Sequence, residues 1–453
     1  MELFLIHPED NVEVDLENGH KYARTAIKAG QPVIKYGFPI GEAKCDIAQG
    51  EHVHTHNLRT ALRKDGTYTY RPQKNVIKPE TPDNINAYLR NNGDIGIRND
   101  IWIVNTVGCV NRTAQKIAEK TGAFCFTHPY GCSQLGEDHA RTQKILRGLI
   151  LHPNAGGVLV LGLGCENNGI ESLRQTLGDY DMKRIRFLKA QDVEDEIREG
   201  VRIVKELQEI AARDRRVGVP VSKLRLGLKC GGSDGYSGIT ANPMVGRISD
   251  HLISMGGTSV LTEVPEMFGA EQLLMDRCVN EEVFNDTVRL INRFKAYFTS
   301  HGQPVSENPS PGNKDGGITT LEEKSLGCVQ KGGRTPVTAV LGYGDIANKP
   351  GLLLLDGPGN DAAAVTNLTA AGCHMILFTT GRGTPLGAPV PTVKIATNSA
   401  LYKKKPKWID FNAMDADAES LWDLLLQTAN GKETKNELGG YREIAIFKDG
   451  VTL

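Results

Sequence analysis

The sequence contains no hydrophobic run near the roughly 20 residues of a membrane-spanning helix, and it has no excess of either charge. Its 453 residues include 53 Lys plus Arg and 54 Asp plus Glu, a formal net charge of −1, whereas nucleic-acid-binding proteins are usually strongly basic. The N-terminal apolar stretch is interrupted by His7, Pro8 and acidic residues, which is not typical of a signal peptide. We therefore expect a cytoplasmic protein with no nucleic-acid or membrane partner, and leave self-association as a homo-oligomer open.

Two glycine-rich nucleotide motifs are also absent. The chain has 50 glycines, but they form neither the GxGxxG dinucleotide fingerprint nor the GxxxxGK[ST] phosphate loop. They have no fixed period, which excludes collagen and low-complexity sequence. Nine cysteines without a signal peptide indicate reduced thiols rather than a disulfide framework.

Four regions differ in their apolar patterning. Residues 1–75 have short strand signals between recurrent Gly and Pro, which predicts a small β-domain. Residues 76–96 are polar and proline-containing, as in a linker. Beyond them strands alternate with helices, which indicates βαβ units; we assign 97–305 to one α/β lobe and 306–453 to a C-terminal α/β lobe. The expected fold class is α/β, with Rossmann-like parallel sheets after a small N-terminal β-domain.

Four apolar strands end in small or turn-forming residues, in VNTVGCVN, VLGLGCENN, LGLKCGGSDG and LLLDGPGND. In open α/β sheets ligands bind at the carboxyl ends of the strands. We therefore expect these loops to form either one site or two sites in separate lobes.

The segment GEHVHTHN places His52, His54 and His56 at alternating positions. If it is a strand, the three imidazoles share one face, and neutral imidazole suits Fe(II), Mn(II) or Zn(II). We predict that His54 and His56 bind a metal ion. The alternatives are a solvated face, carboxylate binding or proton transfer.

A second group follows the strand AFCF in THPYGCSQLGEDH. His128 is a candidate base or ligand there, and Cys132 is a candidate ligand or a small structural residue. Cys109, Cys165 and Cys230 each stand at a strand end. Some dehydratases hold an iron–sulfur cluster with three cysteines, but the close spacing of ferredoxins is absent, so we favour a pocket-lining role for at least one of the three.

Several polar loops offer hydrogen bonds for a ligand with many hydroxyls and one carboxylate. In KCGGSDGYSGITANP, Gly231 and Gly232 allow close approach of the backbone. The side chains that we expect to bind such a ligand are Asn167, Asn168, Ser233, Asp234, Asn313 and Lys314.

These motifs together resemble one family, the altronate and galactarate dehydratases. The resemblance rests on GEHVHTHN, GIRNDIWIVNTVGCVN, GLGCENN, LKCGGSDGYSGITANP and NPSPGNKDGGITTLEEKSLGCVQKGG. It covers most of the chain, and the last segment is closer to the altronate branch. The first region resembles the SAF, or β-clip, domain.

The resemblance implies a metal-dependent hydro-lyase, activated by Fe(II) or Mn(II), that converts a sugar acid to a 2-keto-3-deoxy acid. On chemical grounds we expect His128 or Lys229 to act as the base, and His52 as a third metal ligand or proton carrier. The alternatives are a galactarate or other hydroxy-acid dehydratase, an iron–sulfur hydro-lyase, and a sugar-acid-binding protein without turnover.

Overall fold

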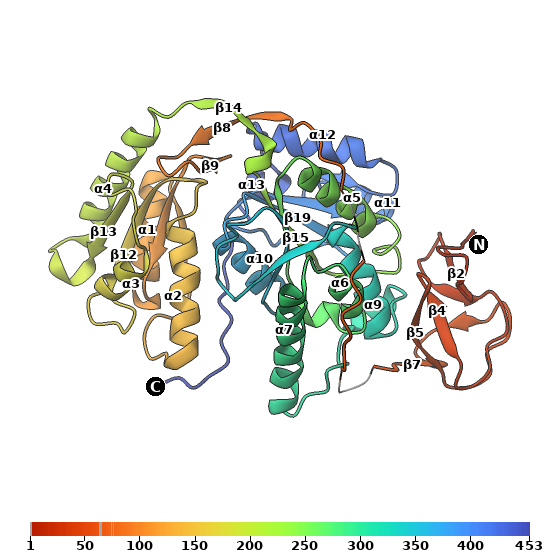
Figure 1. Ribbon diagram of the computed structural model, residues 1–453. Coiled ribbons are helices and arrows are strands. Elements are labelled where there is room, and N and C mark those ends of the chain that lie inside the picture. The colour runs from red at the N-terminus through yellow and green to blue at the C-terminus, as the bar shows by residue number, and fades with distance from the viewer. Residues whose placement is uncertain (1, 63–65, 74, 76) are drawn as a thin grey trace.

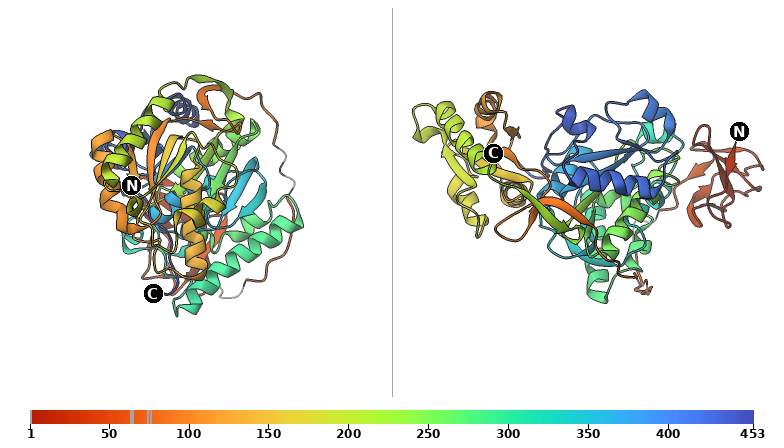
Figure 2. Two further views of the ribbon diagram at one scale, coloured as in Figure 1. Left: turned by 90° about the vertical axis from the view of Figure 1, so that its left-hand side faces the viewer. Right: turned by 90° about the horizontal axis from the view of Figure 1, so that it is seen from above.

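The computed structural model describes residues 2–62, 66–73, 75 and 77–453. Figure 1 shows three bodies in a row, with the N-terminal β-domain at one end, a four-stranded lobe at the other and the largest lobe between them. The view from above in Figure 2 shows the same order. Within the described residues, no helix is long and apolar enough to cross a membrane.

The N-terminal domain is built from two small sheets, as the sequence predicts. They have the strand orders β1-β2-β3-β6 and β4-β5-β7. Tyr36 and Gly37, both at positive φ, form the tight turn of the β4–β5 hairpin. The strands are β1 (Leu3–Phe4), β2 (Val12–Asp15), β3 (Lys21–Ala23), β4 (Pro32–Lys35), β5 (Phe38–Ala43), β6 (His52–Val53) and β7 (Leu58–Arg59).

The four-stranded lobe has a fully parallel sheet in the order β11-β10-β12-β13. Alternate residues of β10 enter two different apolar cores: Ile101 and Ile103 pack with α1 and α4, whereas Trp102 and Val104 pack with α2 and α3. Helices therefore cover both faces, as expected for a buried parallel sheet. The elements are β10 (Asp100–Asn105), α1 (Asn111–Thr121), β11 (Phe124–Phe126), α2 (Gly136–Ile150), β12 (Ala155–Gly162), α3 (Ile170–Thr176), β13 (Ile185–Lys189) and α4 (Glu196–Ala211).

The largest lobe contains a seven-stranded parallel sheet in the order β17-β18-β16-β15-β19-β20-β21. The boundary expected at residue 305 falls between β16 and β17, which belong to this one sheet. Its strands are β15 (Arg225–Cys230), β16 (Thr258–Leu261), β17 (Val337–Leu341), β18 (Gly351–Leu355), β19 (Met375–Thr380), β20 (Thr392–Ala396) and β21 (Phe411–Asn412). Its helices are α5 (Ala241–Ser254), α6 (Glu271–Met275), α7 (Glu281–Ser300), α8 (Pro311–Asp315), α9 (Leu321–Cys328), α10 (Asp361–Ala370), α11 (Ser399–Lys404), α12 (Ala418–Ala429) and α13 (Lys435–Leu438).

Two connections join the lobes. The region expected to be a linker contains β8 (Asn84–Leu89) and β9 (Ile95–Gly96), which form a small sheet with β14 (Arg216–Pro220) that passes over the gap between the lobes in Figure 1. In addition, α2 packs against α10, so one apolar core extends across both lobes.

The β-domain contacts the largest lobe through a buried ion cluster. Glu323 of α9 lies 2.9 Å from Lys21 Nζ and 2.8 Å from Lys35 Nζ, and all three side chains are at most 1% exposed. Lys21 Nζ also donates to the Gly317 carbonyl at 2.9 Å. Because an unpaired charge is costly in such a place, this cluster fixes the β-domain against α8 and α9.

Candidate functional site

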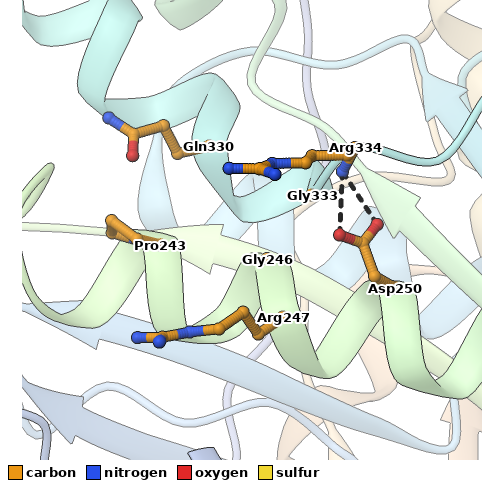
Figure 3. A pocket seen from close by; sticks show the side chains of 7 residues that line it. All are labelled: Pro243, Gly246, Arg247, Asp250, Gln330, Gly333 and Arg334. Carbon is orange, nitrogen blue, oxygen red and sulfur yellow. Dashed lines mark hydrogen bonds between the residues drawn. The ribbon is translucent and has the colours of Figure 1, made fainter. Parts of the chain in front are cut away.

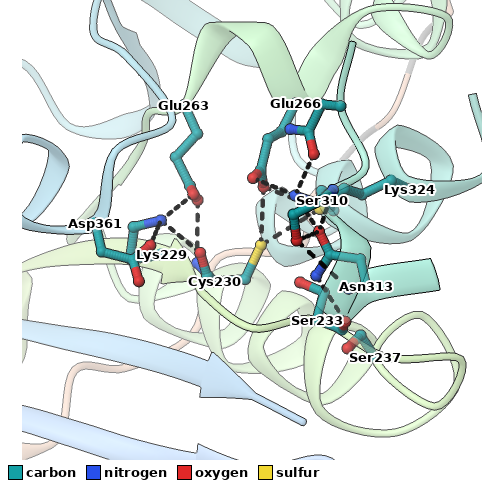
Figure 4. Close-up of polar contacts among 12 residues, drawn as sticks. Lys229, Cys230, Ser233, Ser237, Glu263, Glu266, Ser310, Asn313, Lys324 and Asp361 are labelled. Carbon is teal, nitrogen blue, oxygen red and sulfur yellow. Dashed lines mark hydrogen bonds and ion pairs between the residues drawn. The ribbon is translucent and has the colours of Figure 1, made fainter. Parts of the chain in front are cut away.

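The carboxyl end of β15 contains the densest cluster of buried charges. The Lys229 ammonium lies between the buried Glu263 carboxylate and Asp361 Oδ1, the latter at 2.9 Å (Figure 4). Burial opposes the charge, but the two carboxylates outweigh it and raise the pKa of Lys229 well above its ordinary value. Lys229 is therefore an ammonium at neutral pH. The Asp361 side chain is 36% exposed and gives the cluster its contact with solvent.

Gly231 allows Asp361 to approach Lys229 closely. A Cβ at this position would lie 2.7 Å from both Asp361 Oδ2 and Phe378 Cζ, which is closer than a side chain tolerates. A larger residue at position 231 would displace Asp361 from Lys229.

Three candidate metal donors lie next to Lys229. Cys230 Sγ is 3.1 Å from Glu266 Oε2 and 3.3 Å from Cys328 Sγ, and Cys328 Sγ is 3.3 Å from the same carboxylate oxygen. All three residues are buried. Two thiols and a carboxylate that converge in this way fit one tetrahedral ion with soft ligands, such as Fe(II) or Zn(II), better than Mn(II), which prefers oxygen ligands.

Two lysines lie against these donors. Lys331 Nζ lies 2.7 Å from Cys230 Sγ, and Lys324 Nζ lies 2.8 Å from Glu266 Oε1. Burial disfavours the Glu266 carboxylate, but Lys324 and the neighbouring lysines outweigh this effect and hold its pKa well below the usual range. Glu266 is therefore available as an anionic ligand.

Another buried lysine, Lys394 on β20, has a different environment. Its side chain is fully buried, its Nζ has no hydrogen-bond partner among the described residues, and it lies 3.5 Å from the centroid of the Phe378 ring. Burial lowers its pKa to about 7, with Asp361 opposing the shift and Lys229 adding to it. At neutral pH a large share of Lys394 is a free amine that can accept a proton.

The loop residues predicted around this site lie close together but already have protein partners. The Asp234 carboxylate accepts hydrogen bonds from Thr397 Oγ1 and Asn398 Nδ2. Asn313 Nδ2 donates to the Ser233 carbonyl at 2.8 Å. These contacts fix the loops, and the half-buried Lys314 has the freest side chain of the group.

The predicted histidines gather on the β-domain, although not as one strand. Strand β6 ends at Val53, so His54 and His56 lie in the following turn. The His52 ring centroid is 5.3 Å from that of His54 and 5.9 Å from that of His56, and His52 Nε2 is 3.0 Å from His20 Nδ1. Burial and the nearby His20 lower the pKa of His52 to about 4.

The histidine cluster contacts α8, and α8 in turn borders the buried charged cluster around Lys229. His54 Nε2 lies 2.9 Å from the Lys314 carbonyl. Among the described residues, only Cys230, Glu266 and Cys328 place three donor atoms within 4.8 Å of one another. The histidine nitrogens therefore converge less closely than those three donors.

The remaining predicted residues lie in the four-stranded lobe. His128 is buried, its Nδ1 accepts from the Tyr130 amide and its Nε2 donates to the Asn105 carbonyl at 2.9 Å. With both nitrogens occupied, His128 fixes the loop and is poorly placed to act as a base. Asn168 is also buried and ties loops together, whereas Asn167 is exposed.

Two cavities open near the lobes. One, of about 500 Å³, lies along α5 and contains Arg247 and Arg334, whose guanidinium groups extend to the same side in Figure 3. The other, of about 280 Å³, lies between the lobes and is lined by Arg141 and Arg293, among others. Its wall includes Gly357, whose carbonyl accepts from the Val264 amide at 3.1 Å. Because Val264 follows Glu263, this interlobe cavity approaches the buried cluster; the cavity along α5 does so too, because its lining residue Gln330 precedes Lys331.

Sequence reasoning did not single out most members of the buried cluster. The residues that it left without a role are Glu266, Cys328, Lys324, Lys331, Lys394 and Asp361, and His20 in the β-domain. Lys394 carried the clearest available signal, because a lysine inside the apolar strand TVKIA is unusual in a parallel sheet buried on both faces.

Known proteins resemble this chain along nearly its whole length. Three family models match it: the SAF domain of altronate/galactarate dehydratases at residues 9–61, the second domain of D-galactarate dehydratase/altronate hydrolase at 87–212, and the D-galactarate/altronate dehydratase C-terminal domain at 221–452. They confirm the N-terminal SAF domain expected from the sequence.

Individual relatives agree with these matches. The altronate dehydratase of Escherichia coli (strain K12) is 54% identical over 97% of this chain and 93% of its own length. The altronate dehydratase of Bacillus subtilis (strain 168) is 53% identical over 98% of this chain and 93% of its own length. The galactarate dehydratase (L-threo-forming) of E. coli is 33% identical over 95% of this chain and 90% of its own length. The chain therefore belongs to the altronate/galactarate dehydratase family.

Proposed function

We propose that this protein is a hydro-lyase that removes water from D-altronate to give a 2-keto-3-deoxy acid. Identities of 54% and 53% to two altronate dehydratases, against 33% to a galactarate dehydratase, favour altronate as the substrate. The structural observation that carries the proposal is a charged lysine, Lys229, close to a lysine with a pKa of about 7, Lys394.

These two lysines suit the difficult step of such a dehydration. Removing the proton beside a carboxylate creates an enediolate with additional negative charge, which a fixed cation stabilises. Lys229 supplies that cation, and Lys394 in its neutral form takes the C2 proton. The Lys394 ammonium formed in this way can return the proton to the C3 hydroxyl, which then leaves as water. This assignment replaces Lys229 and His128 as the base, because the former is held protonated and the latter has both ring nitrogens occupied.

We place the metal at Cys230, Glu266 and Cys328, and propose Fe(II) as the ion because two of the three donors are thiols. When bound, a divalent ion polarises a substrate oxygen and stabilises developing negative charge. The competing hypothesis is the sequence-based one, in which His54 and His56 bind the ion.

Metal analysis distinguishes the two donor sets. We expect Cys328→Ser and Glu266→Gln to lose the single iron ion of this site from anaerobically purified protein, because each removes one of three donors, and His54→Ala to retain it. Metal content per chain is measured by mass spectrometry of protein whose circular dichroism matches the wild type. Iron loss in His54→Ala with normal iron in the other two variants would instead assign the ion to the histidine cluster.

The substrate assignment is tested by direct turnover. With iron and reductant, the protein should form a 2-keto acid from D-altronate at a kcat/KM at least tenfold above that for galactarate. The products are identified by mass spectrometry after trapping of the keto group. Tight binding of altronate without any keto acid would show a binding protein, and a preference for galactarate would exclude the altronate assignment.

A further inference from the structure

Three exposed cysteines follow three adjacent strands of the four-stranded sheet. Cys109, Cys132 and Cys165 come after β10, β11 and β12, respectively, and all three are exposed. Val104 of the central strand β10 pairs with Phe126 on one side and Val160 on the other, so the strands are parallel and end almost level. The cysteine loops therefore leave the same edge of the sheet, where α/β folds bind ligands.

Hydrogen bonds join the three loops into one unit. The Gly108 amide donates to the Tyr130 carbonyl and the Asn168 amide to the Gly131 carbonyl, both at 2.9 Å. Asn168 Nδ2 also donates to the Thr106 carbonyl at 3.0 Å. Each loop is thus tied to another within a few residues of its cysteine.

The backbone around Cys132 is held in an unusual conformation. Gly131 before it has φ +99°, and a Cβ there would lie 1.9 Å from the Thr106 carbonyl oxygen. Ser133 after it has φ +63°, which is uncommon for a residue with a side chain. Such strain is concentrated at functional sites, and here it determines where one exposed thiol is placed.

The arrangement of the three thiols does not match a single bound ion. Thiolates around one zinc or iron ion lie about 2.3 Å from it, which brings their sulfur atoms within about 4 Å of one another. The described residues contain only one group of three donor atoms mutually within 4.8 Å, and it is Cys230, Glu266 and Cys328. Cys109, Cys132 and Cys165 share one edge of the sheet, and their sulfur atoms are not all within this distance of one another.

We propose that Cys109, Cys132 and Cys165 bind a [4Fe–4S] cluster whose fourth iron has no cysteine ligand. This trio replaces the one considered from sequence, because Cys230 is buried at the end of β15 against Cys328. Iron–sulfur clusters are held by cysteine thiolates, and an iron without one can bind a hydroxyl or carboxylate oxygen. The exposed Asn167, whose Oδ1 is 3.9 Å from Cys132 Sγ, belongs to the same group of loops. A hydroxy acid on this iron would occupy a second site, in a different lobe from Lys229 and Lys394, and its identity rests on the proposed function, whereas the cluster site does not.

Anaerobic purification followed by iron and acid-labile sulfide analysis tests the site. The wild type, after reconstitution with ferrous iron and sulfide, should carry about four sulfides per chain and a broad visible absorption. Cys109→Ser, Cys132→Ser and Cys165→Ser should each lose at least three quarters of both signals. Cys45→Ser, which replaces an exposed cysteine of the β-domain, is the matched control and should keep them.

The outcomes separate this proposal from the proposed function. Wild-type protein without acid-labile sulfide, or serine variants that keep the full absorption, would overturn the cluster whatever the dehydratase assay gives. Sulfide retained in Cys45→Ser and lost in the three variants, with unchanged circular dichroism, would support it even if altronate is not the substrate. Perturbation of the cluster's electron paramagnetic resonance spectrum by altronate would support binding at the open iron, and an unchanged spectrum would exclude it.

Discussion

Replacing Lys394 with methionine is expected to lower kcat for dehydration by about 10²–10⁴-fold, the usual contribution of a general base. Methionine keeps the length and apolar character of the side chain, and the Lys394 amine has no hydrogen-bond partner among the described residues. The substitution should therefore not destabilise the protein. KM should change much less than kcat, because Lys394 acts on the proton rather than on substrate binding. Steady-state kinetics on altronate measure both constants.

The same assignment fixes the sign of the pH dependence. Lys394 must be neutral to accept a proton, so kcat of the wild type should rise as pH increases through about 7, the pKa of this amine. Burial is the main cause of this lowered pKa and Lys229 lowers it further, whereas Asp361, Asp410 and Glu443 raise it. Lys403→Met, in the exposed part of α11, should leave the profile unchanged. A Lys394→Met variant with wild-type kcat and an unaltered pH profile would exclude Lys394 as the base.

Replacing Glu323 with alanine is expected to destabilise the attachment of the β-domain by about 3–5 kcal/mol, because it leaves Lys21 and Lys35 buried without a counter-charge. Burial disfavours the Glu323 carboxylate, but the two lysines outweigh it and lower its pKa far below the usual range. Its contribution is therefore complete above the ordinary carboxyl pKa of about 4.3 and is lost only as pH falls well below that value. Calorimetry should show an earlier unfolding transition, and hydrogen exchange should show faster exchange in the β-domain.

Two further variants test whether the loss of stability arises from the buried charges. Asp46→Ala breaks the exposed Lys28–Asp46 pair of the same domain and should leave the transition in place, since exposed pairs contribute little. The combined variant Lys21→Met, Lys35→Met and Glu323→Leu should recover most of the lost stability, because apolar residues of similar volume can replace a buried ion cluster. If the triple variant is as unstable as Glu323→Ala, the loss does not arise from the buried charges.

The alternation of apolar runs and polar loops in the sequence predicted much of this fold. The spacing of residues within single motifs predicted less of the functional site. The strand ends at Asn105, Gly162 and Cys230 lie at the carboxyl edges of parallel sheets, as the apolar runs predict. The alternation at His54 and His56 indicated a strand, but the chain turns there, because pairing in β6 ends at Val53.

The site residues that the sequence did not predict are brought together by contacts between segments far apart in the chain. Cys230 meets Glu266 and Cys328 only because β15 and β16 are neighbours in the sheet and α9 packs against the segment that contains Glu266. No spacing rule links these positions. The same holds for Lys394, whose lowered pKa arises from burial beside Phe378 and not from any motif.

The ion pair between Lys35 and Glu323 joins residues 288 positions apart. At a synthesis rate of about 5–20 residues per second, the ribosome needs roughly 15–60 s to make the intervening chain. Until then the β-domain is stabilised by its own small core. Lys21 and Lys35, which are later buried against Glu323, are still hydrated at this stage. Assembly of the enzyme therefore ends with a late docking event, and a nascent chain stalled before residue 323 should carry a folded but unattached amino-terminal module.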